Sequence, residues 1–483
     1  MIRHIENELN QTTTDNGDVA YKSTLDTHLD IFGQISSYRN STEKDILAVF
    51  SKAYSENDLI ARKLIFWARD VRGGAGERRF FRICLKWIAE NNPEDLTPIL
   101  DLVPEYGRWD DLFVLFDTPL EEDMLELVSM QLAEDYLSET PSLLAKHMPS
   151  INTSSEKTNA LGRRFVRAIG TTQKKYRKFL SAIRSKLSIV EKAMSEKRWT
   201  DINYDKIPSK AGLKYRAAFY RNDEDRYTRF LSDLSDGVKK VNSSALYPYE
   251  VISPILDGND SNDILLQGMW ENLPDYISGS SERILPLIDV SGSMNVGSGN
   301  TTPIKIAISL GMYLSERLTG EYKNHFMTFS EQPQLVKITG KTVLEKVRNI
   351  NRADWDMSTD LDSVFELLLK TAIKNKISTE SLPTKIMIFS DMQFNSCTKD
   401  TKLSLFRRWK MRFKECGYTL PDLVFWNLDA STGQLPVTKH DSGTLLVSGF
   451  SPSLMKGILS NKTVDPVSMM LEVISSERYE PVV

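Results

Sequence analysis

The most constraining feature of this sequence is a change in the periodicity of its apolar residues near residue 283. From about residue 43 to residue 240, apolar residues recur every three or four positions in short runs such as KDILAVFSKAY, RRFFRICLKWIAEN and EDLTPILDLVPEYG (residues 94–107). This spacing is typical of amphipathic helices. After residue 283, short apolar runs such as ILPLI and KIMIF alternate with helical runs. That alternation predicts a doubly wound (Rossmann-like) α/β domain with a mostly parallel sheet.

A chain of 483 residues is long enough for several domains. The polar start predicts a flexible lead-in, and the helical runs predict an all-α, HEAT-like helical-repeat module. The stretch VNSSALYPYEVISPILDGNDSND, rich in Ser, Pro, Asn and Asp, predicts a connector. The expected bounds are 1–40 for the lead-in, 41–240 for the helical module, 241–283 for the connector and 284–483 for the α/β domain.

The glycine-rich stretch RGGAGE at residues 72–77 lies between two of the helical runs. It lacks the Lys-Ser/Thr ending of a phosphate-binding loop, and a helix rather than a strand precedes it. We therefore interpret it as a helix–helix turn.

No apolar stretch approaches the about 18 residues needed to span a bilayer. The start of the chain lacks the apolar core of a signal peptide. Three cysteines, Cys84, Cys397 and Cys416, are too few for a disulfide framework. These features predict a soluble, cytoplasmic protein without a membrane partner.

The net charge of −4 hides a strong asymmetry along the chain. Residues 101–140 hold twelve Asp and Glu against one Lys or Arg, and residues 161–200 hold twelve Lys and Arg against two Asp and Glu. An acidic block usually solvates a helical face, whereas a basic block is also what a phosphate backbone attracts.

Within the basic block, residues 171–194 predict one helix with a buried stripe. The stripe residues recur at spacings of three and four: Tyr176, Leu180, Ile183, Leu187 and Val190. The cations lie off this stripe, and either a solvated face or a nucleic-acid surface would explain them. The candidate phosphate contacts are Arg163, Arg164, Arg167, Lys174, Lys175, Arg177, Lys178 and Arg184. Tyr176 and Trp199 are candidates for base stacking, although burial is the simpler expectation for both.

Oxygen-bearing side chains follow the apolar runs of the α/β part. Asp289, Ser291 and Ser293 follow ILPLI, Thr359 precedes a predicted helix, and Asp391 follows KIMIFS. Ligands of doubly wound folds bind at the carboxyl ends of the strands, where these loops would meet. Oxygen ligands without His or Cys favour a hard cation, Mg²⁺ above all, with Mn²⁺ or Ca²⁺ also suitable.

This pattern, Asp289-x-Ser291-x-Ser293, then Thr359, then Asp391, resembles the metal-ion-dependent adhesion site of von Willebrand factor A domains. The resemblance implies that Ser291 and Ser293 bind the metal directly and that Thr359 binds it directly or through water. It implies that Asp289 and Asp391 act mainly through water. The third loop reads SDMQF where many such domains have a glycine after the aspartate, so the role of Asp391 is less firmly implied.

A helical module with a basic face followed by such a domain resembles the architecture of Ro ribonucleoproteins, whose TROVE module binds RNA. In finer detail the chain is similar to the family called domain of unknown function 2828. The stretches that carry this similarity include LLAKHMPSINTSSEKT, KRWTDINYDKIPSKAGLKYRAAF, DVSGSM and IFSDMQF. The resemblance implies the architecture directly and implies RNA binding only by analogy, because a fold does not fix a function.

Three functions follow as hypotheses. The leading one is a non-enzymatic protein that binds structured or single-stranded RNA on its basic face and carries a metal-dependent docking domain. The alternative is a protein-interaction scaffold whose metal captures a carboxylate of a partner, without RNA binding. The third, a metal-dependent phosphoryl-transfer or hydrolytic enzyme, is disfavoured because none of the five histidines lies in a metal or nucleophile motif. No small-molecule substrate is expected.

Overall fold

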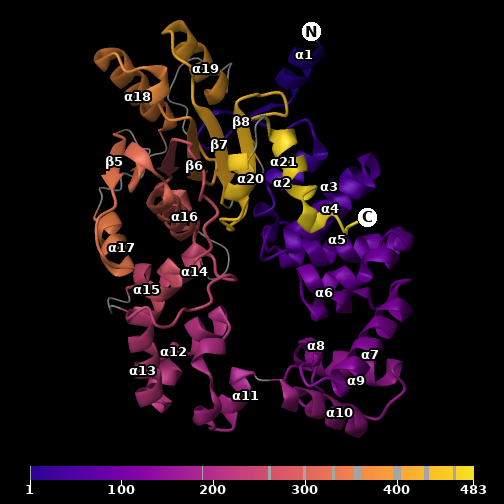
Figure 1. The fold of residues 1–483 in the computed structure, drawn as a ribbon. Helices are drawn as coiled ribbons and strands as arrows, with labels where there is room; N and C mark the ends of the chain where they lie inside the picture. The colour runs from indigo at the N-terminus through magenta and orange to yellow at the C-terminus, as the bar shows by residue number, and fades with distance from the viewer. Residues whose placement is uncertain are drawn as a thin grey trace.

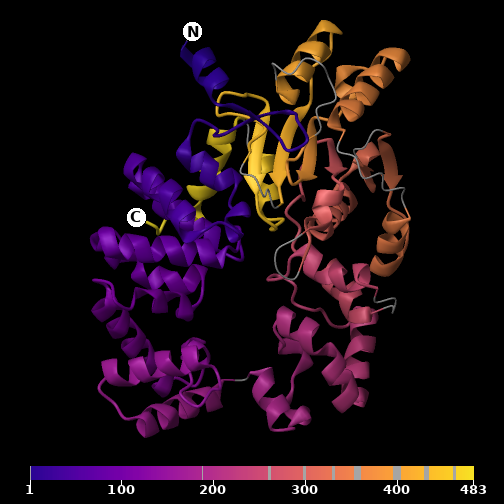
Figure 2. The same ribbon diagram turned by 180° about the vertical axis from the view of Figure 1, so that it is seen from behind.

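The computed structural model of the chain shows secondary structure that matches both periodicities of the sequence. The structure describes residues 2–187, 189–258, 263–296, 301–328, 332–352, 360–394, 404–428, 434–460 and 464–483. A helical region comes first, and an α/β region with a six-stranded sheet follows it. Figures 1 and 2 show two helical arms that run from the α/β region to the opposite end of the molecule. Among the described helices, none has the length and apolar character that crossing a membrane requires.

The first arm begins with three helices that pack in sequence order. They are α3 (Glu43–Glu56), α4 (Asp58–Arg69) and α5 (Arg78–Asn91). The Thr42 hydroxyl caps α3 by accepting a hydrogen bond from the Asp45 amide at 3.2 Å. RGGAGE forms the turn between α4 and α5, as predicted. A side chain at Gly74 would collide with the carbonyl oxygen of Trp67, so this turn requires glycine there.

The predicted helix at residues 94–107 is wrong, because the structure breaks this stretch into shorter turns. It contains two 3₁₀ turns, Pro93–Asp95 and Thr97–Leu102, and the single-turn helix α6 (Val103–Tyr106). Prolines at positions 93, 98 and 104 remove backbone donors at this spacing, which disfavours one continuous helix.

The far end of the first arm carries the acidic and basic blocks. It consists of α7 (Glu121–Leu137), α8 (Leu144–His147), α9 (Glu156–Ala168) and α10 (Gln173–Lys186). The predicted stripe of α10 is confirmed: Tyr176, Leu180, Ile183, Leu187 and Val190 are all buried. The prediction of one helix over 171–194 is wrong, because α10 ends at Lys186 and α11 (Val190–Ser195) is separate.

The second arm returns to the α/β region through α12 (Ser209–Asn222), α13 (Glu224–Ser235), α14 (Pro248–Leu256) and α15 (Ile264–Glu271). The connector expected at 241–283 is therefore not simply a linker. Val251, Ile252 and Leu266 are fully buried, and α14 packs against α16 of the α/β region. The turn-rich composition of this stretch concealed two short apolar helices.

The sheet of the α/β region has the strand order β5-β4-β3-β6-β7-β8. Five strands are parallel to one another, namely β3 (Ile284–Ile288), β4 (His325–Thr328), β6 (Lys385–Ser390), β7 (Asp422–Asn427) and β8 (Thr444–Ser448). The sequence reading missed β5 (Gln334–Lys337), an antiparallel edge strand with no buried residue.

Helices cover both faces of this sheet. Successive residues of a strand face opposite sides, so Ile284 and Ile288 of β3 lie in one core and Leu285 and Leu287 in another. The first core contains α16 (Pro303–Arg317) and α17 (Val343–Asn351), and the second contains α18 (Leu361–Asn375) and α19 (Leu405–Glu415). The doubly wound arrangement is thus present, with a mixed rather than wholly parallel sheet.

The prediction that residues 1–40 form a flexible lead-in is wrong. This segment contains α1 (Ile2–Leu9), a pair of strands, β1 (Gln11–Thr13) and β2 (Val19–Tyr21), and α2 (Thr27–Gly33). Helix α2 packs on β8 so closely that a side chain at Gly33 would overlap Leu446. The polar composition of the segment was misleading because its polar groups bond to one another.

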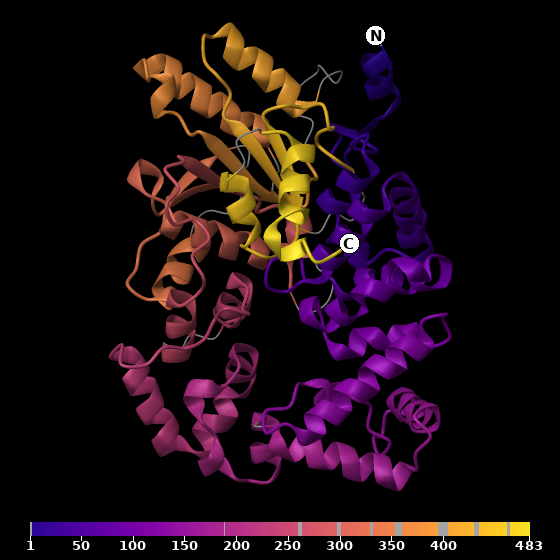
Figure 3. The same ribbon diagram turned by 45° about the vertical axis from the view of Figure 1, so that its right-hand side comes forward.

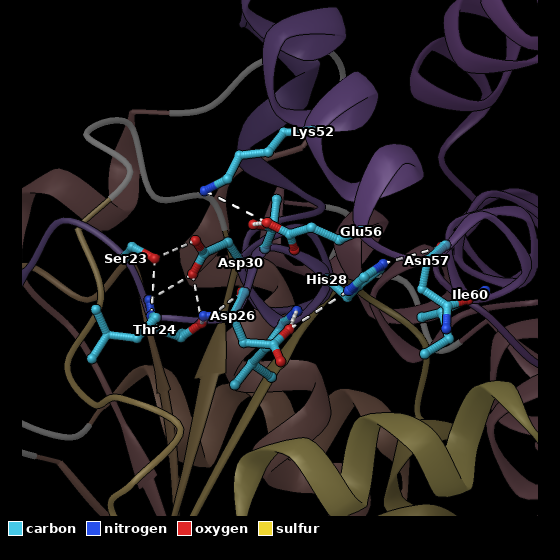
Figure 4. Close-up of polar contacts among 12 residues, drawn as sticks. Ser23, Thr24, Asp26, His28, Asp30, Lys52, Glu56, Asn57 and Ile60 are labelled. Atoms are coloured by element: carbon cyan, nitrogen blue, oxygen red, sulfur yellow. Dashed lines mark hydrogen bonds and ion pairs between the residues drawn. The ribbon is translucent and has the colours of Figure 1, made fainter. Parts of the chain in front are cut away.

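Figure 4 shows this polar network at the start of α2. Asp30 accepts hydrogen bonds from the Ser23 hydroxyl and from the amide and hydroxyl of Thr24, each at 2.6 Å. Asp26 caps α2 by accepting from the Leu29 amide at 3.0 Å. These bonds satisfy buried polar groups that would otherwise oppose folding.

The C-terminal segment closes the chain onto its own first arm (Figure 3). Helices α20 (Leu454–Ser460) and α21 (Pro466–Ile474) follow β8, and α21, which the sequence reading missed, packs against α2 and α4. Beyond α21, Arg478 donates two hydrogen bonds to the buried carboxylate of Asp70 at the end of α4, and the Tyr479 hydroxyl donates a third at 3.0 Å. The chain thus follows a ring-like path.

The Asp70–Arg478 contact predicts a large stability effect. Arg478→Met leaves a buried carboxylate without its cation, and we expect the free energy of unfolding to fall by about 3 kcal/mol. The matched control is Arg72→Met, which removes a 65% exposed side chain paired with Glu105 at 3.5 Å and should cost less than about 1 kcal/mol. Urea unfolding followed by circular dichroism measures both. Equal losses in the two variants would contradict this account of the closure.

Candidate functional site

Two of the predicted metal-binding loops lie side by side at one edge of the sheet. In the parallel pair β3 and β6, Ile288 is opposite Phe389, so Asp289 follows β3 beside the Ser390 end of β6. The Asp289 amide donates to the Phe389 carbonyl oxygen at 3.0 Å. The chain order of the strands reverses between β3 and β6. This is the position at which doubly wound sheets bind ligands.

Hydrogen bonds fix the first loop around the Asp289 carboxylate. Its Oδ1 accepts from the Ser291 amide at 3.0 Å, and its Oδ2 accepts from the Ser390 hydroxyl at 2.5 Å. The hydroxyl oxygens of Ser291 and Ser293 lie 3.1 Å apart. Asp289 is completely buried, whereas Ser293 is exposed. The site is therefore closed at its carboxylate end and open to solvent at Ser293.

Asp391 completes this cluster from the other loop. Its carboxylate accepts from the Gln393 amide at 3.1 Å and interacts with the Ser293 hydroxyl. Burial raises the pKa of Asp391, and burial together with the Asp391 charge raises the pKa of Asp289 to about 7. Asp289, Ser291, Ser293 and Asp391 are thus brought together as predicted, whereas Thr359 lies outside the described residues.

The donor set suits a hard cation. In the described parts of the chain, no Lys or Arg forms an ion pair with Asp289 or Asp391, so two buried carboxyl groups share the site without a cation from the protein. No three His, Cys, Asp or Glu side chains that could hold a metal converge among those residues. Ligation of Mg²⁺ here would depend on the serine hydroxyls together with the two carboxylates.

Met392 occupies the position after Asp391 at which a glycine was expected. Its φ is 68°, in the left-handed region that glycine adopts easily and other residues rarely adopt. Its amide donates to the Ser390 hydroxyl at 3.0 Å, and its side chain is buried in the core beside α19. The loop therefore keeps the backbone conformation of a glycine, and burial of the methionine side chain offsets the strain.

The sequence reading missed a third contributor, the turn between β1 and β2. The Thr14 hydroxyl donates to the Phe394 carbonyl oxygen at 2.7 Å. The Asp15 amide donates to Gln393 Oε1 at 3.0 Å, and Asn16 donates to the Gln393 carbonyl oxygen at 2.8 Å. The N-terminal hairpin thus braces the Asp391 loop. Nothing in the local sequence around residue 14 signals a contact almost 400 positions away.

The second predicted site lies on α9 and α10. Six of its eight cations are exposed, and in the described chain none of the six forms an ion pair: Arg163, Arg167, Lys174, Lys175, Arg177 and Lys178. These six residues are called the basic surface below. An exposed cluster of unpaired cations in an acidic chain attracts polyanions.

The other two predicted cations have partners inside the protein. Arg164 donates bidentately to Asp117 at 2.6 Å, so the acidic and basic blocks do contact each other in cis at this point. Arg184 donates to the carbonyl oxygens of Ala145 and Met148 and holds the loop before α9. Both arginines stabilise the fold, which leaves few donors for a phosphate.

The two aromatic candidates differ in exposure. Tyr176 is buried, and its hydroxyl donates to the Pro149 carbonyl oxygen at 2.9 Å, so its ring is not available for stacking. Trp199 is half-buried. The expectation that Tyr176 is buried is therefore confirmed.

Clefts border the basic surface on the α9 side. One cleft of about 1120 Å³ is lined by Lys146, Lys157 and Arg167 together with His147, and burial lowers the pKa of this histidine. A neighbouring cleft of about 670 Å³ is lined by Arg163 and shares Arg167 with the first. The cations therefore line concave surfaces as well as an exposed helix face.

Comparison with known proteins gives two family matches and one relative. The model called domain of unknown function (DUF2828) matches residues 14–116 and 166–275, and the model called domain of unknown function (DUF7788) matches residues 284–480. The chain is 32% identical to the uncharacterized protein L728 of Acanthamoeba polyphaga mimivirus, over 98% of this chain and 89% of the relative.

The conformation of Met392 predicts an unusual order of stability. Met392→Ala loses a buried side chain, at a cost of about 2–5 kcal/mol. Met392→Gly loses the same side chain but relieves the left-handed backbone, so we expect it to be more stable than the alanine variant by about 1 kcal/mol.

The matched control is Met387, which is fully buried in β6 and has no positive φ. There the alanine variant should be the more stable of the two, by about 0.5–1 kcal/mol. Urea unfolding of the four variants measures both differences. The same order at both positions would show that strain at Met392 is absent.

The raised pKa of Asp289 predicts a pH dependence. In EDTA, the folded state holds the Asp289 proton up to about pH 7, whereas the unfolded chain loses it near 3.8. The contribution of Asp289 to the free energy of unfolding is fully present below pH 3.8. It is lost as the pH rises to about 7, and the loss is at most about 4 kcal/mol. Asp289→Asn should remove this slope. Parallel pH profiles of unfolding free energy for wild type and variant would contradict the prediction.

Proposed function

The chain belongs to the domain of unknown function 2828 family, and from that premise we propose that it is a non-enzymatic RNA-binding protein whose α/β region is a metal-dependent docking domain. RNA lies along the basic surface of α9 and α10, and structured and single-stranded RNA both fit this part of the proposal. The likeness to Ro ribonucleoprotein architecture, a helical module followed by an α/β domain, supports it by analogy.

The basic surface is the observation that carries this proposal. Its six cations are exposed and, over the described residues, not ion-paired, although the protein as a whole has a net charge of −4. Arg164 of α9, by contrast, is paired with Asp117 and Glu121. Lys and Arg contacts to phosphates supply affinity with little base discrimination.

We further propose that the α/β region is von Willebrand factor A-like and binds Mg²⁺, with Mn²⁺ or Ca²⁺ as possible substitutes. Ser291 and Ser293 would hold the ion directly, and Asp289 and Asp391 would act mainly through water. The ion would keep much of its charge beside neutral hydroxyls and could accept an acidic side chain of a partner. The strand-end cluster of two carboxylates and two hydroxyls supports this, and Thr359 remains part of the proposed set.

The same cluster favours a second candidate function, a protein-interaction scaffold. In that case the bound cation would capture a carboxylate of a partner protein at the exposed Ser293 side, and the basic surface would meet an acidic protein rather than RNA. Retention of a protein partner that EDTA releases, without any RNA affinity, is the outcome that distinguishes this candidate.

A cytoplasmic location without a membrane partner or a small-molecule substrate is also part of the proposal. Three cysteines in 483 residues suit a reducing compartment.

Charge reversal tests RNA binding. We expect Lys174, Arg177 and Lys178, changed together to Glu, to abolish most of the affinity for a short fluorescent RNA in anisotropy titrations. If three phosphate contacts are lost, the plot of the logarithm of the association constant against the logarithm of the salt concentration should have a slope that is shallower by about 2.

The matched control changes Lys370, Lys374 and Lys414 to Glu, on α18 and α19 at the opposite end of the molecule (Figure 1). Their side chains are also exposed, and the net charge changes equally. Equal losses of RNA affinity in both triple variants would show that the effect comes from the overall charge and not from the position of the cations. An RNA affinity of wild type that does not depend on salt would contradict the proposal.

Titration with MgCl₂ tests the docking site. At a concentration about 100-fold above Kd, a ligand that binds only the folded state adds about 2.7 kcal/mol of stability. We expect this gain for wild type and its loss when Ser291 and Ser293 are both changed to Ala. The control pair is Ser451 and Ser453, whose hydroxyls lie 2.7 Å apart after β8. If the Ser291 and Ser293 double alanine variant still gains stability from MgCl₂, the assignment of these ligands is contradicted.

A further inference from the structure

A groove between α7 and α10 combines aromatic rings with lysines. It has a volume of about 470 Å³, within the range of about 300–1,000 Å³ that is usual for small-ligand sites. Leu132 and Tyr136 of α7 form one wall, and Lys175, Lys178 and Phe179 of α10 form the other. Neither aromatic residue was a candidate from the sequence, because they lie 43 positions apart on two different helices.

The rings of Tyr136 and Phe179 stack on each other. Their centroids are 5.1 Å apart and their planes differ by 19°. Tyr136 is 47% exposed and Phe179 is half-buried, so the pair is open to solvent along the groove. A large exposed aromatic ring is costly to leave in water and is commonly a binding surface.

Lys186 anchors the carboxyl end of α7 beside this aromatic pair. Its ammonium donates to the carbonyl oxygens of Tyr136 at 2.7 Å and Ser138 at 2.9 Å, at the carboxyl end of α7. The same nitrogen lies 5.8 Å from the centre of the Tyr136 ring. Lys186 therefore fixes the backbone that carries Tyr136, and the stacking contact with Phe179 orders its ring, which lowers the entropic cost of binding.

Lys175 and Lys178 give the groove its charge. Both are exposed, and neither has an ion-pair partner within the described residues. They also belong to the basic surface, so the groove continues directly into it. Apolar rings between cations fit a ligand with a flat aromatic part and an anionic part. A nucleotide has both.

We propose that this groove binds one unpaired nucleobase of a single-stranded RNA, which stacks on the Tyr136–Phe179 pair while the adjoining phosphates face Lys175 and Lys178. This inference rests on the proposed RNA binding and narrows its ligand to single strands. The faces of a base inside a duplex are covered by its neighbours and cannot reach a ring on the protein. Stacking on aromatic side chains tolerates every base, so little sequence preference follows.

Anisotropy titrations of the full chain test this with a single-stranded RNA and a blunt duplex of the same sequence. Tyr136→Ala should weaken single-strand binding about 10- to 100-fold, since base stacking is worth that much on alanine substitution. Duplex binding should not change. Tyr136→Phe keeps a ring and should retain single-strand affinity. Tyr220→Ala is the matched control, because Tyr220 of α12 is 52% exposed and lies outside the groove.

An oligonucleotide with an abasic site in place of each base in turn gives a sharper reading. The oligonucleotide is kept as short as binding allows, so that it cannot shift and place another base in the groove. At one position, loss of the base should then weaken binding to wild type and leave binding to Tyr136→Ala unchanged, because the two changes remove the same contact. Independent losses at every position would overturn the inference.

The outcomes separate this inference from RNA binding itself. If Tyr136→Ala and Tyr220→Ala bind single strands equally while the charge-reversed α10 variant does not, RNA binding stands and the nucleobase groove is overturned. Equal weakening of single strands and duplex by Tyr136→Ala also overturns it. If wild type binds no RNA, or binds only an acidic peptide, both ideas fail together.

Discussion

The buried carboxylate of Asp70 is the contact on which the arrangement of the whole chain depends. It lies at the end of α4 in the first helical arm, and its partners Arg478 and Tyr479 lie at the end of the α/β region. A buried charge is tolerated only when it is paired and hydrogen-bonded, so this site requires the C-terminal segment to meet the first arm. The second arm is joined to the α/β region through α14 and α16. Both arms are therefore joined to the α/β region, and α9 and α10, which carry the basic surface, lie at the opposite end of the molecule (Figure 1).

Other contacts between distant parts of the chain connect the N-terminal segment to the proposed metal site. The turn at Thr14–Asn16 bonds to the loop that carries Asp391, and α2 packs on β8. Asp289 and Asp391 are both buried with raised pKa values, because two carboxyl groups share a site without a positive partner from the described residues. Such a pair favours either a shared proton or a bound cation. If a divalent cation replaces the shared proton, docking at this site would depend on both the pH and the concentration of divalent ions.

Local patterns in the sequence predicted much of this structure. Most strands and helical runs of the α/β region, together with the stripe from Tyr176 to Val190, were predicted correctly because each depends on residues within one element. The cluster of Asp289, Ser291, Ser293 and Asp391 was also predictable, since parallel strand ends converge on one sheet edge. Contacts between distant segments were not. The lead-in appeared flexible because the bonds of Asp30 and Thr14 cannot be read from composition, and Arg164 and Arg184 appeared free because their partners lie on other elements. The Tyr136–Phe179 pair was hidden for the same reason.

The central claim is that RNA lies on α9 and α10 and reaches the groove beside α7. Ultraviolet crosslinking of the full chain to a single-stranded RNA, followed by mass spectrometry of the peptides that carry a nucleotide, tests it most directly. We expect adducts within residues 163–186 and at Tyr136, and loss of these adducts when unlabelled single-stranded RNA competes. Adducts confined to the α/β region, or none above the level of a duplex control, would contradict it.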